Sequence, residues 1–353
     1  MGVGDTPMGV TATSETARET VRSVAVRPVW VVHAVLVLPF LLGLSLPLSL
    51  QYVPLAVSVV LFGLPHGAVD HLAVERSRGA SPTYRGMILV GGLYALLGGT
   101  YLALWFLAPV LSFVLFIAVT WAHWGQGDVY ALVAVEGVTH LRTRAQRALA
   151  AAVRGGLPML VPLLSYPGQY REVAALLVGR FGVAANDLAP LFEAETRLAL
   201  GTGFVALTLL ALGLGAARGG VGDPGWRVDA LETGLLWAFF LAVPPVLAIG
   251  VYFCLWHSVR HIARLALVDP SAADALARGD WRPALARFAR DAAPLTAVSV
   301  AFLGGFYLLV PVRPTSLPET VGLYLVLIAV LTLPHVVVVS LMDRAEGVWS
   351  VGG

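Results

Sequence analysis

Residues 51–76 read QYVPLAVSVVLFGLPHGAVDHLAVER. The stretch begins as an apolar run of the kind that crosses a bilayer, and His66, Asp70 and His71 then follow before the loop begins at Arg76. An ionisable side chain within a membrane segment is costly, so it usually faces the protein interior and marks a functional position. The rest of the sequence must therefore supply an interior for two imidazoles and a carboxylate.

The composition of the chain is that of a membrane protein. Of its 353 residues, 58% are hydrophobic and 12% are charged, and the mean hydropathy is +0.81. A soluble domain would carry about twice that charge. The net charge of +2 gives no indication of a nucleic-acid partner. The single cysteine, Cys254, excludes an intrachain disulfide and a cysteine-based metal site.

Apolar blocks of about twenty residues, long enough for a hydrocarbon core of ~30 Å, recur along the chain. They cover residues 29–49, 51–74, 86–107, 109–134, 145–165, 196–217, 229–266, 292–312 and 318–342. The block at 229–266 is too long for one span, because about forty helical residues would reach ~60 Å. Pro244 and Pro245 lie inside it and predict a break into two spans. The predicted fold class is all-α: a polytopic integral membrane bundle of about nine to ten transmembrane helices.

Arginines follow alternate apolar blocks, whereas the connections near residues 50 and 108 carry none. Because cytoplasmic loops are enriched in basic residues, this alternation predicts a multi-pass protein of the cell membrane with a cytoplasmic N-terminus. Residues 1–27 lack the apolar core of a signal peptide and are predicted to be a disordered cytoplasmic tail. Residues 28–345 are then a single transmembrane domain. The loop at 166–195 would face outward and carry short amphipathic helices at the surface.

Six of the eight histidines fall within or at the ends of apolar blocks: His66, His71, His123, His257, His261 and His335. In the stretch LWHSVRHIARL, His257 and His261 are four residues apart. On a helix they would share one face and could bind one metal ion together. Imidazoles without thiolates suit iron, copper or zinc, and the predicted bundle would therefore enclose a buried metal site.

Two carboxylates follow histidines at short spacing. Asp70 comes four residues after His66, and Asp128 comes five residues after His123. A ligating imidazole usually donates its other ring N–H to a carboxylate or carbonyl, so each aspartate is a candidate partner for its neighbouring histidine. An alternative role for both aspartates is that of helix-end charges near the membrane interface.

Four segments together resemble the Brp/Blh family of bacterio-opsin-related proteins and bacterial-type β-carotene 15,15′-dioxygenases. They are PHGAVDH at 65–71, WAHWGQGD at 121–128, WHSVRH at 256–261 and LPH at 333–335. The resemblance extends from about residue 50 to residue 342 and is weak across 166–230.

The resemblance implies a non-haem Fe(2+) centre that uses O₂ to split the central 15,15′ double bond of β-carotene into two retinal molecules. It implies four iron ligands, all of which are also catalytic: His66, His123, His257 and His261. Further residues are expected to support the site or to face the substrate: Asp70, His71, Asp128, Trp124, Trp256 and His335. β-Carotene would enter from membrane lipid, and retinal would be available to an opsin.

Other classes of protein account for part of the same pattern. A two-iron membrane hydroxylase, desaturase or ketolase shares HxxxH, but the HxxHH boxes typical of those enzymes are absent. A non-catalytic carotenoid- or retinal-binding helper of opsin biogenesis, a transporter and a haem cytochrome also remain alternatives. A retinylidene receptor or pump is excluded, because its Schiff base needs a lysine and all 23 basic residues are arginine.

Overall fold

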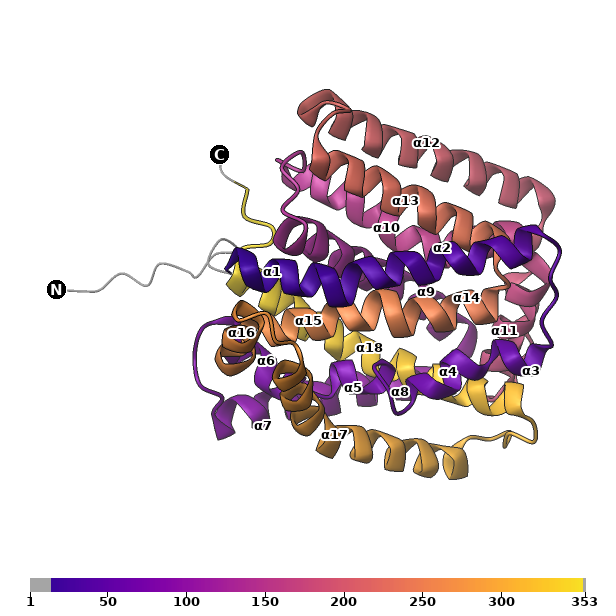
Figure 1. The fold of residues 1–353 in the computed structure, drawn as a ribbon. Helices are drawn as coiled ribbons and strands as arrows, with labels where there is room; N and C mark the ends of the chain where they lie inside the picture. Colours follow the sequence, from indigo (N-terminus) through magenta and orange to yellow (C-terminus); the bar gives the residue numbers. More distant parts are fainter. Residues whose placement is uncertain (1–13, 352–353) are drawn as a thin grey trace.

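A computed structural model describes residues 14–351 of the chain. Every regular element in that range is helical, and the long helices run roughly side by side as a bundle (Figure 1). The first half contains α1 Glu15–Val21, η2 Arg22–Val26, α2 Arg27–Leu41, α3 Leu48–Gln51, α4 Val53–Ser58, α5 Gly63–Gly67, α6 Asp70–Ser77, α7 Tyr84–Leu93, η3 Tyr94–Gly98, α8 Gly99–Leu107, α9 Pro109–Tyr130 and η4 Ala131–Val135. The second half contains α10 Arg144–Ser165, α11 Pro167–Gly179, η5 Ala185–Phe192, α12 Ala194–Gly219, α13 Pro224–Ala242, α14 Pro245–Val251, η6 Tyr252–Ser258, α15 Val259–Val268, α16 Pro270–Ala277, α17 Arg282–Leu309 and α18 Leu317–Glu346.

Each predicted apolar block overlaps one candidate membrane span within residues 14–351, but α13 is not among these candidates, so the double crossing of the block at 229–266 stays a prediction. Nine helical stretches there are long and apolar enough to cross a bilayer: Glu15–Leu41, Leu48–Ser77, Tyr84–Leu107, Pro109–Val135, Arg144–Ser165, Ala194–Gly219, Pro245–Val268, Arg282–Leu309 and Leu317–Glu346. The outer helices expose apolar side chains, such as Leu198 at 72%, Leu41 at 69% and Ile88 at 69%. A soluble protein rarely leaves large contiguous apolar surface uncovered, so these faces are suited to lipid.

The long apolar block at 229–266 is divided as predicted. Val243 and Pro244 are extended, with ψ near 133° and 139°, and they separate α13 from α14. Pro245 then opens α14, where its missing N–H leaves no helical hydrogen bond unmade. Helix α13 packs mainly on α10 and α2, and α2 lies between α13 and α14 in Figure 1, so this block contributes two separate helical segments to the bundle. Helix α1 and the end of α18 lie at the same end of the molecule (Figure 1).

The N-terminal prediction is wrong for the residues that the structure describes. Residues 1–13 of the predicted tail lie outside the described range, but α1 and η2 are helical and lead directly into α2. Their apolar side chains recur about every four residues, and Ala17 and Val21 are only 2% exposed. The Thr20 hydroxyl also donates to the Leu276 carbonyl at 3.0 Å. Packing against α16 therefore stabilises a helix in a segment whose composition resembles that of a tail.

Helices α11 and η5 form within the loop at 166–195, where the sequence predicts short helices. Helix α11 packs on α18 and α9, and its Leu177 and Val178 are buried. It lies at the end of the bundle where α3 and the start of α14 also lie (Figure 1). It therefore closes that end of the bundle, in addition to lying at its surface.

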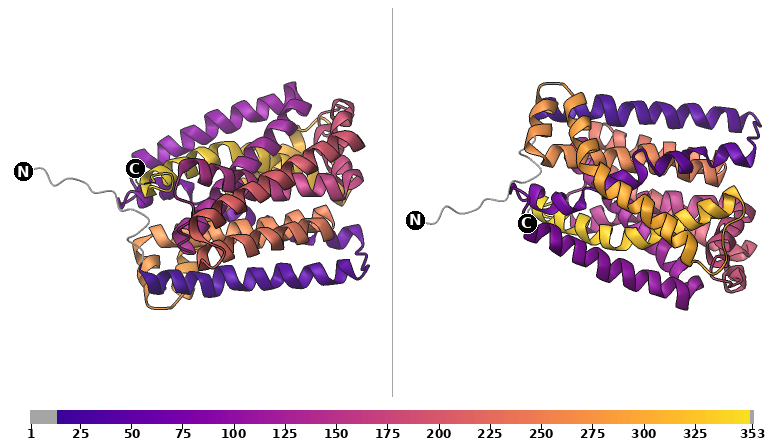
Figure 2. Two further views of the ribbon diagram at one scale, coloured as in Figure 1. Left: turned by 90° about the horizontal axis from the view of Figure 1, so that it is seen from above. Right: turned by 90° about the horizontal axis from the view of Figure 1, so that it is seen from below.

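The most deeply buried span is α14–η6–α15, in which 83% of the apolar window is inside the protein. By contrast, only 11% is inside for the spans Tyr84–Leu107 and Arg282–Leu309. The two views of Figure 2 show the orange segment that contains α14–α15 flanked by helices from both the first half and the end of the chain. Functional side chains on this central span therefore face protein on nearly every side.

Glycines allow α9 and α10 to approach closely. A Cβ at Gly125 would lie 2.0 Å from the carbonyl oxygen of Ala151, and a Cβ at Gly155 would lie 1.9 Å from that of Trp121. Both distances are far below contact, so only glycine fits at either position. Small residues at helix interfaces permit such approach within membranes. Because His123 lies only two residues from Gly125, this contact also determines the position of a candidate metal ligand.

We expect Gly155→Val to destabilise the fold, because a branched side chain would force α9 and α10 apart. Overpacking of this kind costs about 1–3 kcal/mol. The measurement is the fraction of detergent-solubilised protein that remains monodisperse after heating. Gly203→Val is the matched control, since a Cβ at Gly203 on α12 meets nothing within 4 Å. Equal thermal stability of the two variants would contradict this account of the interface.

Candidate metal centre

Five histidines from four spans gather in the interior of the bundle: His66 on α5, His123 on α9, His257 on η6, His261 on α15 and His335 on α18. Each is at most 7% exposed. Seven pairs of these rings have centroids between 4.7 and 6.5 Å apart. We call these five residues the histidine cluster. It contains the four ligands implied by the sequence and adds His335.

The ring nitrogens converge closely enough to share an ion. The Nε2 atoms of His123 and His257 are 3.1 Å apart. Two nitrogens that each lie about 2.1 Å from one metal ion, at a right angle to each other, would be about 3 Å apart. Ligand atoms of His66, His123 and His335 all lie within 4.8 Å of one another, as do those of Asp70, His261 and His335. The donor set and its spacing fit a metal ion.

Three ring nitrogens of the cluster are buried and have no hydrogen-bond partner among the described residues. They are Nδ1 of His123, Nε2 of His261 and Nε2 of His335. Buried polar atoms are nearly always paired, because an unpaired one loses the hydrogen bonds that water would offer it. Coordination to a metal would satisfy Nε2 of His261 and Nε2 of His335, and this is a second observation that fits a metal centre. Nδ1 of His123 belongs to the ring whose Nε2 approaches His257, so the same ion would not satisfy it.

A strained turn presents His66. Phe62 has φ 60° and ψ −49°, and the Gly63 N–H donates to the Leu61 carbonyl at 2.6 Å. This is a γ-turn, a rare conformation for a residue with a side chain, and it breaks the helix between α4 and α5. A Cβ at Gly63 would lie 2.4 Å from the Ser58 carbonyl oxygen, so the turn requires glycine there. The Gly63 carbonyl then contacts Nδ1 of His66, which leaves Nε2 free to face the cluster.

His257 and His261 share a helix face, as their spacing predicts. Their rings stack at 15° with centroids 6.5 Å apart. His257 lies in the seven-residue π-helix η6, and π-helical turns are rare and frequent at functional sites. Gly127 on α9 lies against the His257 ring, where a Cβ would be 3.6 Å from Nδ1. The tight packing of α9 therefore reaches both histidines of the 3.1 Å pair.

Asp70 pairs with a different histidine from the one that the sequence predicts. Its Oδ2 lies 2.7 Å from Nδ1 of His335 and also accepts the Tyr94 hydroxyl at 2.6 Å. His66 instead uses the Gly63 carbonyl. The carboxylate thus holds Nδ1 of His335 and leaves Nε2 for the cluster, which is the arrangement common behind metal-bound imidazoles. Neither Tyr94 nor the role of His335 could be read from the sequence, although LPH at 333–335 placed a histidine in an apolar block.

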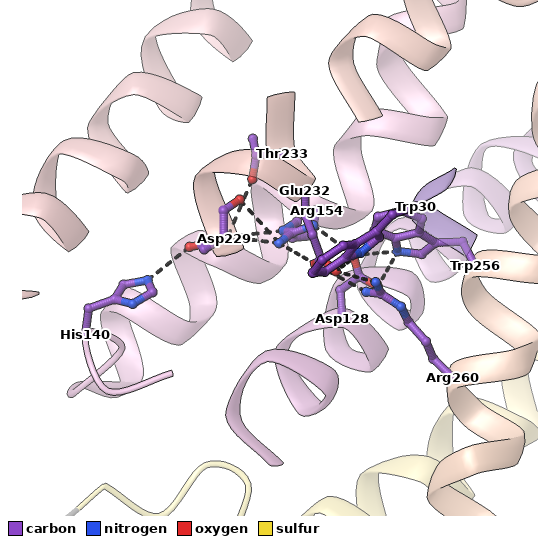
Figure 3. Close-up of polar contacts among 9 residues, drawn as sticks. All are labelled: Trp30, Asp128, His140, Arg154, Asp229, Glu232, Thr233, Trp256 and Arg260. Carbon is purple, nitrogen blue, oxygen red and sulfur yellow. Dashed lines mark hydrogen bonds and ion pairs between the residues drawn. The ribbon is translucent and has the colours of Figure 1, made fainter. Parts of the chain in front are cut away.

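Asp128 belongs to a second buried polar cluster, not to a pair with His123 (Figure 3). Its carboxylate accepts from Nε1 of Trp256 at 3.0 Å and lies 3.5 Å from guanidinium nitrogens of both Arg154 and Arg260. We call this group the arginine–carboxylate network. It contains Trp30, Asp128, His140, Arg154, Asp229, Glu232, Thr233, Trp256 and Arg260. The predicted pairing of Asp128 with His123 is therefore wrong, because two arginines and an indole N–H compete for the same carboxylate.

The network joins helices that are distant in sequence. Arg154 on α10 bonds to Glu232 at 2.8 Å and to Asp229 at 3.0 Å, both on α13. Arg260 on α15 contacts Glu232, and Trp30 on α2 donates to Glu232 at 2.7 Å. Arg154 is 1% exposed and Glu232 is fully buried. Arg154 and Glu232 could have been found from the sequence, because each is a charged residue inside an apolar block. The same criterion identified the histidines.

The other predicted site residues divide between the cavity and the core. His71 is half-buried, bonds to the Ala68 carbonyl at 3.1 Å, and lines the cavity outside the cluster. Trp124 lines the cavity beside His257, with ring centroids 5.6 Å apart. Trp256 is fully buried and does not line the cavity, since its indole faces Asp128 and the guanidinium of Arg260. A substrate-facing role for Trp256 is therefore not supported.

A cavity of about 710 Å³ passes the cluster. His66, His123, His257 and His335 line it, and most of the other side chains around it are apolar. One flank is formed by α7, η3 and α17, and several lining residues there are exposed on the outer surface: Gly91, Ala95, Leu295, Val298 and Phe302. The cavity is thus apolar, brings the imidazoles to its wall, and opens sideways between helices that would face lipid.

Comparison with known proteins agrees with this site. Residues 57–343 match the family model described as beta-carotene 15,15′-dioxygenase. The chain is 49% identical over 347 residues to Blh of Halobacterium salinarum, a probable beta-carotene 15,15′-dioxygenase, and the match covers 98% of this chain and all of that protein. It is 36% identical over 324 residues to Brp of the same organism, which has the same description, and that match covers 88% of each chain. No solved structure matches the chain. With five buried histidines beside an apolar cavity and these matches along nearly its whole length, the chain belongs to the β-carotene 15,15′-dioxygenase family.

Proposed function

We propose that the histidine cluster holds one non-haem iron ion and that β-carotene is cleaved beside it. As a member of its family the chain is an enzyme, a β-carotene 15,15′-dioxygenase that forms retinal. The observation that carries the location of the site is the convergence of five buried imidazoles, four of which line the wall of an apolar cavity. The arginine–carboxylate network offers no comparable position, because its charged groups are already paired with one another.

Five histidines would hold the ion: His66, His123, His257 and His261, as the motifs imply, and His335, which the tertiary structure adds. Neutral imidazole binds iron, copper and zinc. The family reaction is an oxidation by O₂, and Zn²⁺ has no redox chemistry, so iron is the better match. Iron bound here would supply the activation of O₂ that amino-acid side chains lack. Asp70 would hold the His335 ring in the required tautomer.

The protein's own part in the reaction is to bind the hydrocarbon substrate, to orient it, and to exclude water from the cavity. The apolar walls bind a hydrocarbon and exclude water, and the fixed rings define one point along the cavity where a double bond can react. In the overall reaction one C=C bond breaks and each of its carbons receives one oxygen atom of O₂. Two aldehydes form without any further reductant, so no general acid or base is required at the wall.

The flank between η3 and α17 would admit the substrate from lipid and release retinal to it. An opsin in the same membrane could then take up the product, and this hand-over is part of the proposal. The cytoplasmic N-terminus likewise stays a prediction from the arginine pattern. A helper without catalysis would need the cavity but no metal, so metal content separates the two functions.

The decisive experiment is expression in a β-carotene-producing bacterial host. We expect loss of the orange colour and recovery of retinal for the wild-type chain. His66→Ala, His257→Ala and His261→Ala should each reduce retinal below detection while the protein still inserts into the membrane. Leu198→Ala is the control, since Leu198 is 72% exposed on α12 and does not line the cavity. Near-normal turnover with bound metal in any of the three alanine variants would remove that residue from the ligand set.

Metal analysis of the purified chain should find about one iron per polypeptide. The reason is that the two groups of converging donors among the described residues, His66–His123–His335 and Asp70–His261–His335, share His335, so one ion is expected to use that imidazole. Two irons per chain would favour a hydroxylase-like centre. Absence of bound metal in active protein would refute the proposal altogether.

Asp70→Asn should weaken metal retention by about 10–100-fold, as is typical for the loss of a carboxylate behind a ligating imidazole. Asp128→Asn should instead lower thermal stability, because it leaves Arg154 and Arg260 less well compensated. The measurement is residual iron after dialysis against a chelator, with heat inactivation followed in parallel. The proposed separation of the two clusters is untenable if both variants lose metal equally.

A further inference from the structure

The cavity has a closed arm whose length can be read along two unbroken helices. On α9 it is lined from Phe113 to His123, and on α18 from Leu325 to His335. Each interval is ten residues. At an α-helical rise of about 1.5 Å per residue, the cluster lies about 15 Å from the end of the cavity.

The other two histidine-bearing spans give longer intervals. The cavity lining begins at Pro245 on the helix that carries His257, and at Tyr52 on the span that carries His66. These intervals are twelve and fourteen residues. A π-helix interrupts the first and a γ-turn interrupts the second, so neither converts directly into a length at the α-helical rise. On all four spans the cavity-lining histidine lies ten to fourteen residues from the same end of the cavity.

That end is closed by packed side chains. Tyr52, Leu55 and Val246 form a small apolar core, and each is at most 5% exposed. Leu325 and Val173 pack against that core. Helix α11 contributes Tyr170, Val173 and Leu177 to the lining and covers this end of the bundle. We call this group of side chains the plug; it consists of Tyr52, Leu55, Val173, Val246 and Leu325.

In contrast to the end closed by the plug, the flank of the cavity between α7, η3 and α17 is open to the outside. Val298 and Phe302 on α17 line the cavity and are 59% and 50% exposed. Across from them, Gly91 and Ala95 line it and are exposed as well. A rod that enters through this flank can therefore extend inward only until one of its ends meets the plug.

We infer that the plug sets which bond is cut, by stopping the substrate with half of its length beyond the histidine cluster. The inference rests on the proposed function. β-Carotene is an apolar rod about as long as the ~30 Å hydrocarbon core, so half of it is ~15 Å. This matches the ten-residue interval between the plug and the cluster. The plug residues are specificity determinants and take no part in the chemistry.

Substitutions that fill the closed arm with a larger side chain test directly whether the plug sets the position of the cut. Val246→Phe and Leu325→Phe should hold the rod farther out, so that the cut moves by at least one double bond from the centre. The products then change from two retinals to one shorter and one longer apocarotenal, which chromatography with mass detection resolves. Val31→Phe is the matched control, because Val31 is 61% exposed on α2 and does not line the cavity. Exclusively central cleavage by both filled variants would overturn the inference.

A second measurement uses the wild-type chain, so it does not depend on how the variants fold. The substrate is a β-apocarotenal that keeps one intact ring half and is shortened at the other end. A stop at the plug predicts a cut at the same distance from the ring, with retinal as the ring-containing product. A ring-containing product shorter than retinal, from a cut at the new midpoint, would overturn the inference. Failure of the wild-type chain to form retinal from β-carotene would instead refute the proposed function itself.

Discussion

A polar side chain within hydrocarbon has no water to bond with, so it must find its partners inside the protein. This constraint accounts for both buried clusters. The histidines turn their ring nitrogens toward one another beside the cavity, and the charged residues form a closed set of ion pairs a short distance away. Lipid-facing surfaces carry the apolar side chains that remain. The helices are arranged so that the polar and charged side chains, which are the most costly to bury in hydrocarbon, contact one another.

The two clusters are mechanically connected through shared helices. Helix α9 carries both His123 and Asp128, and α15 carries both His261 and Arg260. A second arginine on α15, Arg264, bonds to Asp343 and Glu346 at the end of α18, the helix of His335. Removing one partner from such a buried pair is strongly destabilising, so the pairs resist rotation or sliding of these helices. Ion pairs that do not touch the cavity thus help to fix where the imidazoles lie.

Inside the bundle, most charged side chains are separated from the apolar cavity, and this separation suits the oxidation of a hydrocarbon. Carboxylates lie behind the imidazoles or in the arginine–carboxylate network, whereas the cavity is walled mainly by apolar side chains. The γ-turn at Phe62 and the π-helix η6 are two of the departures from regular α-helix; the γ-turn precedes His66 by one helical turn, and η6 carries His257. Strained or rare backbone of this kind persists only where surrounding packing enforces it. Here Gly63 and Gly125 allow that packing.

The sequence predicted the fold class and nearly all of the spans, because the thickness of hydrocarbon imposes a length and an apolar composition on every crossing. It also predicted the break at Pro244–Pro245, the shared face of His257 and His261, and the histidines of PHGAVDH and WAHWGQGD as candidates. These features depend on residue type and on local helical spacing. The helical character of Glu15–Val26 escaped the sequence, since packing against α16 supplies its stability.

The partners of the polar side chains depend on how the helices pack. Asp70 is one helical turn from His66 in sequence, yet it binds His335 and Tyr94, and Asp128 binds two arginines in preference to His123. Spacing along a helix states which side chains could meet, but a carboxylate binds the best donors that other helices bring within reach. For the same reason, residue types and spacing alone were enough to predict that the chain spans a membrane and carries buried histidines. The gathering of five of them, four on the wall of a closed apolar arm, results from helix packing, which no local pattern encodes.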